Sequence, residues 1–270
     1  MEMQHDATLF DGTAEYYARY RAGYPAAAID DIVATFGLGP STKVLDLGSG
    51  TGQVASPLAR LGVPVIAFEP DRQMVCVGAG LTAELPVAWV SSPSSRLDDP
   101  AVRRIVDGAR VCTMGSSFHW MDRPAVAIAL DEILEAGGGI AVLSSGESVW
   151  RGPGSGGTWR AGPRAAAVES PGEGPRAGQS PYSHPPKQHQ EVLAESPFSD
   201  VEVRTFTWSR RIDIDGIIGL QLSTSYASPR LLGDRVAEFS ETLSERLMAF
   251  EPSGSFTGEE TCELIVARRP

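Results

Sequence analysis

The 270-residue sequence predicts an α/β protein built on a mostly parallel sheet. Short apolar segments typical of strands alternate with segments of helical spacing, and a glycine-rich turn directly follows the first apolar segment. Hydrophobic residues make up 42% of the chain and charged residues 21%, which is the composition of a protein with a substantial core. Strands that are separated by helices imply a parallel sheet with right-handed crossovers.

Residues 1–40 are expected to form an N-terminal helical cap. A tyrosine-rich helix is predicted over 13–21. A second helix is predicted over 25–36, because proline suits a first turn and apolar residues recur at a spacing of three or four. Glycines at 37 and 39 end it.

Residues 41–150 are expected to form the core of the fold. The predicted strands cover 43–47, 64–68, 87–90, 110–114 and 140–143. The predicted helices between them cover 53–61, 71–78, 101–106 and 123–136. This alternation is what a parallel sheet requires.

Residues 151–200 are expected to be a Gly/Pro-rich mobile insertion, because 151–190 contain eight glycines and seven prolines. A lid over a pocket and a plain disordered loop are equally open interpretations of it. Residues 201–270 are expected to complete the fold, with strands over 201–208 and 262–268 and helices over 215–225 and 234–250 that help to form an acceptor site.

The charge of the chain limits its partners. It has 34 acidic and 23 basic residues, a net charge of −11, which disfavours nucleic acid and anionic membranes. No apolar run approaches the ~20 residues that cross a bilayer, and the first residues are polar, so we expect a soluble, cytoplasmic protein. Three cysteines and four histidines without ligand spacing predict no metal site.

The glycine-rich turn and two acidic residues indicate the ligand. Gly48, Gly50 and Gly52 follow a strand that contains Asp46, but Gln53 occupies the position where a dinucleotide fingerprint needs a small residue. Glu69 ends the second strand at the same sheet edge, where a carboxylate can accept hydrogen bonds from both hydroxyls of a ribose. The pattern predicts an adenosine-like ligand without a pyrophosphate, and S-adenosylmethionine has these properties. A nicotinamide dehydrogenase is disfavoured.

These segments resemble a known family. Residues 45–52 and 68–71 resemble the first two motifs of class I S-adenosylmethionine-dependent methyltransferases. The resemblance continues in 16–25, 114–122 and 134–142, in the order of the family. It implies a Rossmann-like seven-stranded sheet of order 3-2-1-4-5-7-6, with strand 7 antiparallel, helices on both faces and S-adenosylmethionine as the cofactor.

The resemblance also implies roles for individual residues. Asp46 and the three glycines would line the methionine part of the cofactor, Glu69 would bind the ribose, and Pro70 and Met74 would flank the adenine. Other predicted cofactor-binding residues are Tyr16, Tyr20, Ser49, Gln53 and Gly115, together with Ser94 and Ser95 where the family often has an acid. The alternative for Tyr16 and Tyr20 is an aromatic helix face in the core.

Methyl transfer is an in-line displacement that needs alignment, and a base if the acceptor is a hydroxyl or a protonated amine. His119, with an ordinary pKa of about 6.5, is the candidate base. Phe118, His119, Trp120 and Tyr226 are the candidate acceptor-binding residues. Packing of the pocket floor is the favoured alternative for His119 and Trp120, and a surface position is favoured for Tyr226.

The composition also suggests an acceptor. Lysine is nearly absent while Arg, Ala, Gly and Pro abound, which is similar to proteins of GC-rich actinobacteria. The acidic charge and the tyrosine-rich start resemble aminosugar N-methyltransferases of aminoglycoside antibiotic biosynthesis. We therefore expect N-methylation of a cationic small molecule, a natural product. An O-methyltransferase of a neutral or carboxylate metabolite and a non-catalytic S-adenosylmethionine-binding module are the alternatives.

Overall fold

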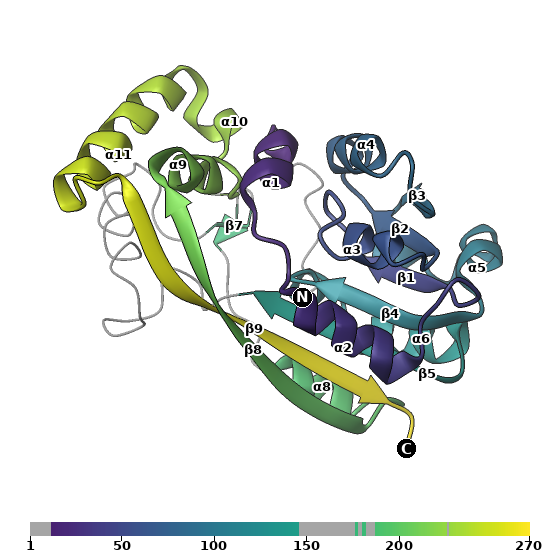
Figure 1. Ribbon diagram of the computed structural model, residues 1–270. Coiled ribbons are helices and arrows are strands. Elements are labelled where there is room, and N and C mark those ends of the chain that lie inside the picture. Colours follow the sequence, from purple (N-terminus) through teal and green to yellow (C-terminus); the bar gives the residue numbers. More distant parts are fainter. Residues whose placement is uncertain (1–11, 146–175, 178–179, 182–186, 226) are drawn as a thin grey trace.

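The computed structural model describes residues 12–145, 176–177, 180–181, 187–225 and 227–270. Its main element is a seven-stranded sheet of order β3-β2-β1-β4-β5-β9-β8 (Figure 1). The strands are β1 (Val44–Leu47), β2 (Val65–Glu69), β3 (Val87–Ser91), β4 (Ala109–Gly115), β5 (Leu134–Ser145), β8 (Asp200–Asp213) and β9 (Ser255–Arg268). β9 runs antiparallel to both of its neighbours, β5 and β8, and the other neighbouring strands are parallel. The expected order 3-2-1-4-5-7-6, with strand 7 antiparallel, is confirmed.

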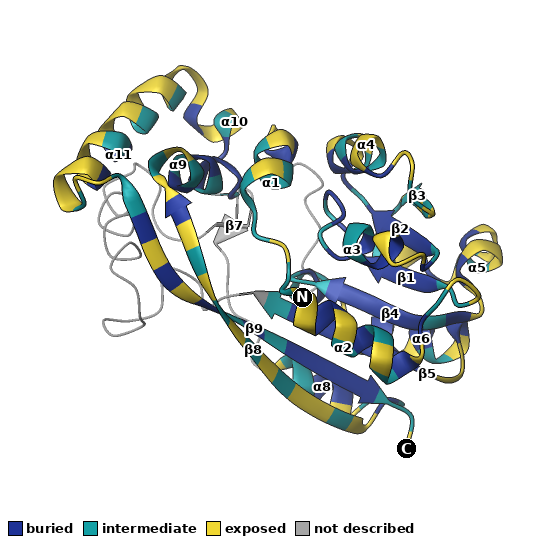
Figure 2. Cartoon of the chain, in the orientation of Figure 1, coloured by how far each residue is buried: buried dark blue, intermediate teal, exposed yellow. Residues whose placement is uncertain are grey.

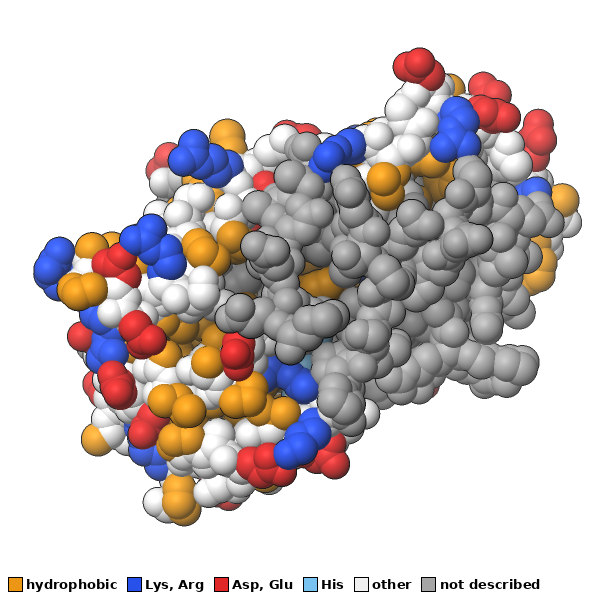
Figure 3. All heavy atoms as spheres, turned by 180° about the vertical axis from the view of Figure 1, so that it is seen from behind, with side chains coloured by type: hydrophobic (Ala, Val, Ile, Leu, Met, Phe, Trp, Pro, Cys, Tyr) orange, Lys and Arg blue, Asp and Glu red, His pale blue; other side chains and the backbone are white. Residues whose placement is uncertain are grey.

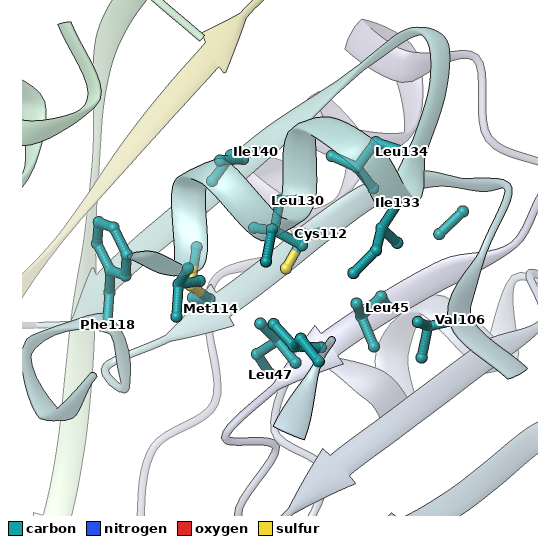
Figure 4. Packing of buried hydrophobic residues seen from close by; sticks show 14 of the residues in the cluster. Leu45, Leu47, Val106, Cys112, Met114, Phe118, Leu130, Ile133, Leu134 and Ile140 are labelled. Carbon is teal, nitrogen blue, oxygen red and sulfur yellow. The ribbon is translucent and has the colours of Figure 1, made fainter. Parts of the chain in front are cut away.

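Helices cover both faces of this sheet. The helices on the sheet are α2 (Ala26–Phe36), α3 (Ala55–Arg60), α4 (Arg72–Leu81), α5 (Pro100–Val106), α6 (Arg123–Ile133) and α8 (His189–Ala194). The other α-helices of the described residues are α1 (Ala14–Tyr20), α9 (Ile214–Leu222), α10 (Pro229–Leu232) and α11 (Val236–Phe250). Because side chains alternate along a strand, Leu45 and Leu47 pack under α5, α6 and α8, whereas Val44 packs under α2 and α3. Figure 4 shows the first of these two layers, in which Leu45, Leu47 and Met114 lie beneath Leu130 of α6.

The last two strands are longer than the sheet. β8 and β9 have 14 residues each and pair along their whole length, but β5 pairs only with Cys262–Arg268 of β9. The remaining half of the hairpin projects beyond the sheet and leads to α9, α10 and α11 (Figure 1). Burial alternates along this half of β9 and becomes continuous inside the sheet (Figure 2).

The projecting part has a small core of its own. Ile212, Ile217, Leu243, Leu247 and Phe256 form a buried cluster between the hairpin, α9 and α11. Helix α1 lies beside α9 (Figure 1), so the first helix of the chain contacts this C-terminal part. The arrangement brings residues from both ends of the sequence to the edge of the sheet where β1 and β4 end.

Two expectations need correction. The expected insertion over 151–200 is too long, because α8 lies within it and Val192, Leu193 and Phe198 are buried. Two short strands, β6 (Arg176–Ala177) and β7 (Ser180–Pro181), pair with each other, while the other residues between 146 and 186 lie outside the described part. The helix expected over 123–136 ends at Ile133, where β5 begins.

The described residues allow two further statements. None of their helices combines the length and the apolar character needed to span a bilayer. Nor do the His, Cys, Asp and Glu side chains within these residues gather in a group of three or more that could hold a metal ion.

Candidate functional site

A pocket lies at the edge of the sheet where β1 and β4 end. It encloses about 400 Å³, a volume that includes space open to solvent. Its walls come from α1 and the segment after it, from the turn between β1 and α3, and from the end of β4. The lining residues are Tyr17, Arg21, Ala22, Tyr24, Asp46, Gly48, Ser49, Gln53, Val54, Gly115 and Ser116.

The turn after β1 requires its glycines. Gly48, Gly50 and Gly52 have φ angles of 67°, 57° and 97°, a region that side chains other than glycine's rarely adopt. A Cβ at Gly48 would lie 2.5 Å from Cβ of Ser117, and one at Gly50 would lie 3.3 Å from Cε1 of Tyr17. The turn therefore exposes its backbone to the pocket.

Asp46 is a buried acid with one unused oxygen. Its side chain is 1% exposed, and Oδ1 accepts a 2.7 Å hydrogen bond from Oγ1 of Thr113. Oδ2 has no hydrogen-bond partner within the described part of the chain, although most buried polar atoms have one. Burial, opposed by the bond from Thr113, raises the pKa of Asp46 to about 6. An unpaired buried oxygen at a pocket wall is best satisfied by a donor or a cation from a ligand.

Gln53 adds a second unpaired acceptor. Its Nε2 donates a 2.8 Å hydrogen bond to Oγ1 of Thr51, and its Oε1 is buried without a partner. Both Asp46 and Gln53 line the pocket. This wall therefore favours a ligand that carries hydrogen-bond donors.

Glu69 lies directly behind the glycine turn. Its Oε2 accepts a 2.9 Å hydrogen bond from the backbone N–H of Gly50, and its Oε1 accepts one of 2.9 Å from Asp71. Burial raises the pKa of Glu69 to about 7, against the effect of these two bonds. Through these hydrogen bonds the carboxylate connects the turn after β1 with the end of β2. Each of its oxygens retains a lone pair for a further donor.

Another part of the pocket lining comes from the N-terminal segment. Oη of Tyr24 and Oγ of Ser116 are 3.0 Å apart in a hydrogen bond, and burial raises the pKa of Tyr24. The guanidinium carbon of Arg21 lies 5.2 Å from the ring centre of Tyr17. Burial also raises the pKa of Tyr17, and the charge of Arg21 opposes that shift. The pocket is thus lined by two phenols and one arginine as well as by the acid Asp46.

The structure brings together only some of the cofactor-binding residues expected from the sequence. Asp46, Gly48, Ser49, Gln53 and Gly115 line the pocket, and Gly50 and Gly52 belong to the same turn. Other expected residues lie outside the lining: Glu69 at the end of β2, Pro70 directly after it, Met74 in α4, and Ser94 and Ser95 in the short turn η1 (Ser94–Arg96) after β3.

The tyrosines of α1 are placed differently from the expectation. Tyr16 and Tyr20 stack with ring centres 6.2 Å apart and do not line the pocket. Tyr20 also packs against α9, where a Cβ at Gly219 would lie only 2.2 Å from its ring. Of the three tyrosines of α1, the one that lines the pocket is Tyr17. The sequence could have suggested this only through the helical phase of these three residues.

Sequence reasoning missed six lining residues. They are Tyr17, Arg21, Ala22, Tyr24, Val54 and Ser116. Ser116 has the only positive φ, 52°, among the described non-glycine residues, which marks the end of β4 as an irregular turn. No residue type in the sequence signals this conformation.

The expected acceptor-binding residues form a separate cluster. Phe118 is fully buried, and its ring centre lies 5.2 Å from that of His189 on α8. The ring of His119 lies 4.6 Å from Trp120 and 6.4 Å from His189. None of Phe118, His119 and Trp120 is among the pocket-lining residues, and Tyr226 lies outside the described residues.

Arg123, a buried arginine in contact with this cluster, was not anticipated from the sequence. Nη1 of Arg123 donates a 2.9 Å hydrogen bond to the carbonyl of Lys187 and lies 3.2 Å from Nδ1 of His189. Burial, together with the charge of Arg123, lowers the pKa of His189 to about 4. His189 is therefore neutral at physiological pH and accepts the bond from Arg123.

No protein-family model matches this chain. Over 145 residues it is 32% identical to an uncharacterized methyltransferase of Mycobacterium tuberculosis (strain H37Rv), a match that covers 52% of this chain and 54% of the relative. An uncharacterized methyltransferase of Mycobacterium bovis matches equally well. The chain thus spans about half the length of the curated relatives it matches.

Solved structures show the fold over nearly the whole chain. A putative type II methyltransferase from Anaeromyxobacter dehalogenans has a TM-score of 0.59 and 19% identity, covering 93% of this chain and 98% of its own. The YcgJ protein of Bacillus subtilis has a TM-score of 0.52 and 13% identity, covering 91% and 100%. The [4+2]-cyclase SpnF has a TM-score of 0.51 and 16% identity, covering 93% and 84%. The chain has the seven-stranded Rossmann-like fold found in methyltransferases.

Proposed function

We propose that the protein is an S-adenosylmethionine-dependent methyltransferase of class I that acts on a small molecule. One observation in the site carries the proposal: the same pocket is lined by a buried acid, Asp46, with an oxygen that has no partner among the described residues, and by an arginine, Arg21. Such a pair is complementary to the ammonium and carboxylate of an amino acid. The similarity to curated methyltransferases over 145 residues supports the same proposal.

Other residues of the site are suited to the ribose and the adenine of the cofactor. The glycine turn lines the pocket, and the positive φ of Gly48 is a conformation that needs glycine. Glu69 holds the turn and has lone pairs left for the two ribose hydroxyls. Asp46 would bind the ammonium, Arg21 the carboxylate and Glu69 the ribose. Pro70 and Met74, at the end of β2, would flank the adenine.

S-adenosylmethionine supplies, when bound, a methyl group on a positively charged sulfur. The residues of this chain then have to hold both reactants in line and exclude water. Tyr17 and Tyr24 are half-buried, and Tyr24 is fixed by Ser116, so this wall can help to keep water away from the reacting groups. The residues that line the pocket hold the two reactants in position, and none of them is proposed here as an acid or a base.

Calorimetry with S-adenosylmethionine and S-adenosylhomocysteine tests the cofactor. The wild type should bind both, and Asp46→Asn should weaken both by about 10- to 100-fold, the usual contribution of a hydrogen bond to a charged group. Asp99→Asn is the matched control, because Asp99 caps α5 away from the pocket. An Asp46→Asn variant that binds as tightly as the wild type would overturn the proposal.

Release of S-adenosylhomocysteine tests the activity. Binding without release, over a panel of amine and hydroxyl acceptors, would identify a non-catalytic module instead. The similar fold of the [4+2]-cyclase SpnF is a reason to test this outcome, since it shows that the fold occurs in a protein named for another reaction. A methyltransferase should release one S-adenosylhomocysteine for each methyl group transferred.

For the acceptor, we propose an amino group of a cationic, aminoglycoside-like natural product. The net charge of −11 supports this choice, because an acidic protein attracts a polycation. On the face shown in Figure 3, acidic and basic side chains are mixed over the described part, so no continuous basic patch opposes it there. Added salt should raise the apparent KM for such an acceptor, and a KM independent of salt would contradict the proposal.

His119 is the proposed base. It belongs to the short turn η2 (Phe118–Trp120) that follows β4, next to the end of the pocket formed by Gly115 and Ser116. His119→Gln should lower kcat and leave the affinity for S-adenosylhomocysteine unchanged. An unchanged kcat would assign the ring to packing with Trp120 and His189.

A further inference from the structure

Helix α9 reaches the pocket through one hydrogen bond. Ser223, the C-terminal cap of α9, is fully buried, and its Oγ accepts a 3.0 Å hydrogen bond from Nε of Arg21. The same hydroxyl donates its hydrogen to the carbonyl of Leu220 at 2.6 Å. Because its hydrogen is committed to Leu220, the hydroxyl can only accept from Arg21. The two residues are 202 positions apart in the sequence.

Arg21 is held in a defined way by this bond. Its Nε is bound by Ser223, and its guanidinium lies over the ring of Tyr17 at 5.2 Å. Among the described residues, its two Nη groups have no hydrogen-bond or ion-pair partner. An arginine fixed at Nε and stacked on a ring presents a pre-oriented fork of N–H donors, which matches a carboxylate.

The backbone around Arg21 is fixed to the same C-terminal part. Tyr20 packs so closely on α9 that any side chain at Gly219 would collide with its ring. Nη2 of Arg210 on β8 donates a 3.3 Å hydrogen bond to the carbonyl of Tyr20. Contacts with α9 and β8 thus hold the end of α1. The same C-terminal part of the protein therefore holds both the side chain of Arg21 and the backbone beside it.

We infer that Ser223 is a positioning residue for the amino-acid tail of the cofactor. It holds Arg21 so that the guanidinium meets the carboxylate of the tail while Asp46, which lines the same pocket, meets the ammonium. A long side chain ordered before the ligand arrives loses less entropy on binding. The segment inserted between β8 and β9 therefore contributes to cofactor affinity through Arg21. This inference rests on the proposed function.

The test compares two ligands by calorimetry. S-adenosylhomocysteine has the amino-acid tail, whereas 5′-methylthioadenosine has the same nucleoside and sulfur without it. Ser223→Ala should weaken S-adenosylhomocysteine by about two- to tenfold, the cost of ordering one long side chain, and leave 5′-methylthioadenosine unchanged. Arg21→Gln should show the same selectivity with a larger loss, about 10- to 100-fold.

Thr224→Ala is the matched control. Thr224 is buried beside Ser223, and its hydroxyl makes the same kind of bond within the helix, to Gln221 at 2.6 Å, but no described bond to Arg21. The Thr224→Ala variant should leave the ratio of the affinities for S-adenosylhomocysteine and 5′-methylthioadenosine unchanged. If Ser223 acts through Arg21, the double variant Arg21→Gln/Ser223→Ala should bind S-adenosylhomocysteine no more weakly than Arg21→Gln alone.

The possible failures are distinguishable. If the wild type binds neither ligand, the proposed function is wrong, and the inference fails with it. If the wild type binds S-adenosylhomocysteine but Ser223→Ala keeps the wild-type ratio, or the effects of the two substitutions add, the inference alone is wrong. A general structural defect would weaken both ligands together and would also overturn it.

Discussion

Asp46 and Thr113 lie side by side on β1 and β4, and the hydroxyl of Thr113 donates a 2.7 Å hydrogen bond to Oδ1 of Asp46. The parallel register of the two strands sets this pairing, so the position of the acid is fixed by the sheet itself. Oδ2 is left without a partner. The pair orients the carboxylate so that its unused oxygen is available to a ligand.

Removal of this support should weaken both stability and binding. In Thr113→Val the shape is retained, but a buried carboxylate oxygen loses its donor. The free energy of unfolding should fall by about 1–3 kcal/mol. Urea unfolding measures this loss, and calorimetry should show weaker binding of S-adenosylhomocysteine. Thr113→Ser keeps the hydroxyl and is the control; equal losses in both variants would assign the effect to packing.

Cofactor affinity should depend on pH through Glu69. Burial raises the pKa of this carboxyl to about 7, so most molecules carry it protonated at pH 6 and ionised at pH 8. If the ionised form accepts the ribose hydroxyls, the affinity for S-adenosylhomocysteine should fall by about tenfold from pH 8 to pH 6. In Glu69→Gln this part of the pH dependence should disappear. A wild-type affinity independent of pH would contradict the role of Glu69.

The same pKa predicts the opposite trend for the stability of the ligand-free protein. The folded protein binds the proton of Glu69 more tightly than the unfolded chain does, since the ordinary pKa is 4.5. The stabilisation is complete below pH 4.5 and is lost as the pH rises through 7. The Tm of the wild type should therefore fall, relative to that of Glu69→Gln, between these pH values. A relative rise would show that the pKa is lowered instead.

The glycine turn offers a direct test of local backbone strain. Gly48→Ala combines a φ of 67° with a Cβ 2.5 Å from Ser117, so it should lower the free energy of unfolding by about 2–4 kcal/mol. Gly80→Ala is the control, because a Cβ there meets nothing within 4 Å. As a substitution within α4, it should stabilise the protein by about 0.5–1 kcal/mol. Equal effects would show that the turn does not require its glycine.

Local sequence patterns predicted the sheet because each parallel strand is a short apolar run followed by a turn. They missed the full length of β8 and β9, which run over Asp200–Asp213 and Ser255–Arg268 rather than 201–208 and 262–268. The projecting halves are polar and stay extended because they pair with each other. Such pairing between distant segments leaves no periodicity strong enough to detect.

The sequence predicted the site residues that belong to a local backbone motif. It did not predict those whose role depends on contacts between residues far apart in the sequence. Asp46 and Gly48 were found because a strand followed by glycines has a local signature. Arg21 was not found, since its role depends on Ser223, 202 residues later. Tyr17 was missed because the orientation of α1 depends on its contact with α9, which the sequence of α1 does not encode.

The extent of the insertion can be tested at α8. Leu193 is fully buried in the core layer beneath α6, although the sequence predicted that it would belong to a mobile segment. Leu193→Ala should lower the free energy of unfolding by about 2–4 kcal/mol, as for other buried leucines. Glu195→Ala is the control, because the side chain of Glu195 makes an exposed ion pair with Lys187, and its removal should change the free energy of unfolding by less than about 0.5 kcal/mol.

A lid would open without global unfolding, so amides of α8 would exchange hydrogen faster than those of β4. If α8 belongs to the core, both should exchange at comparable rates, and Leu193→Ala should accelerate both together.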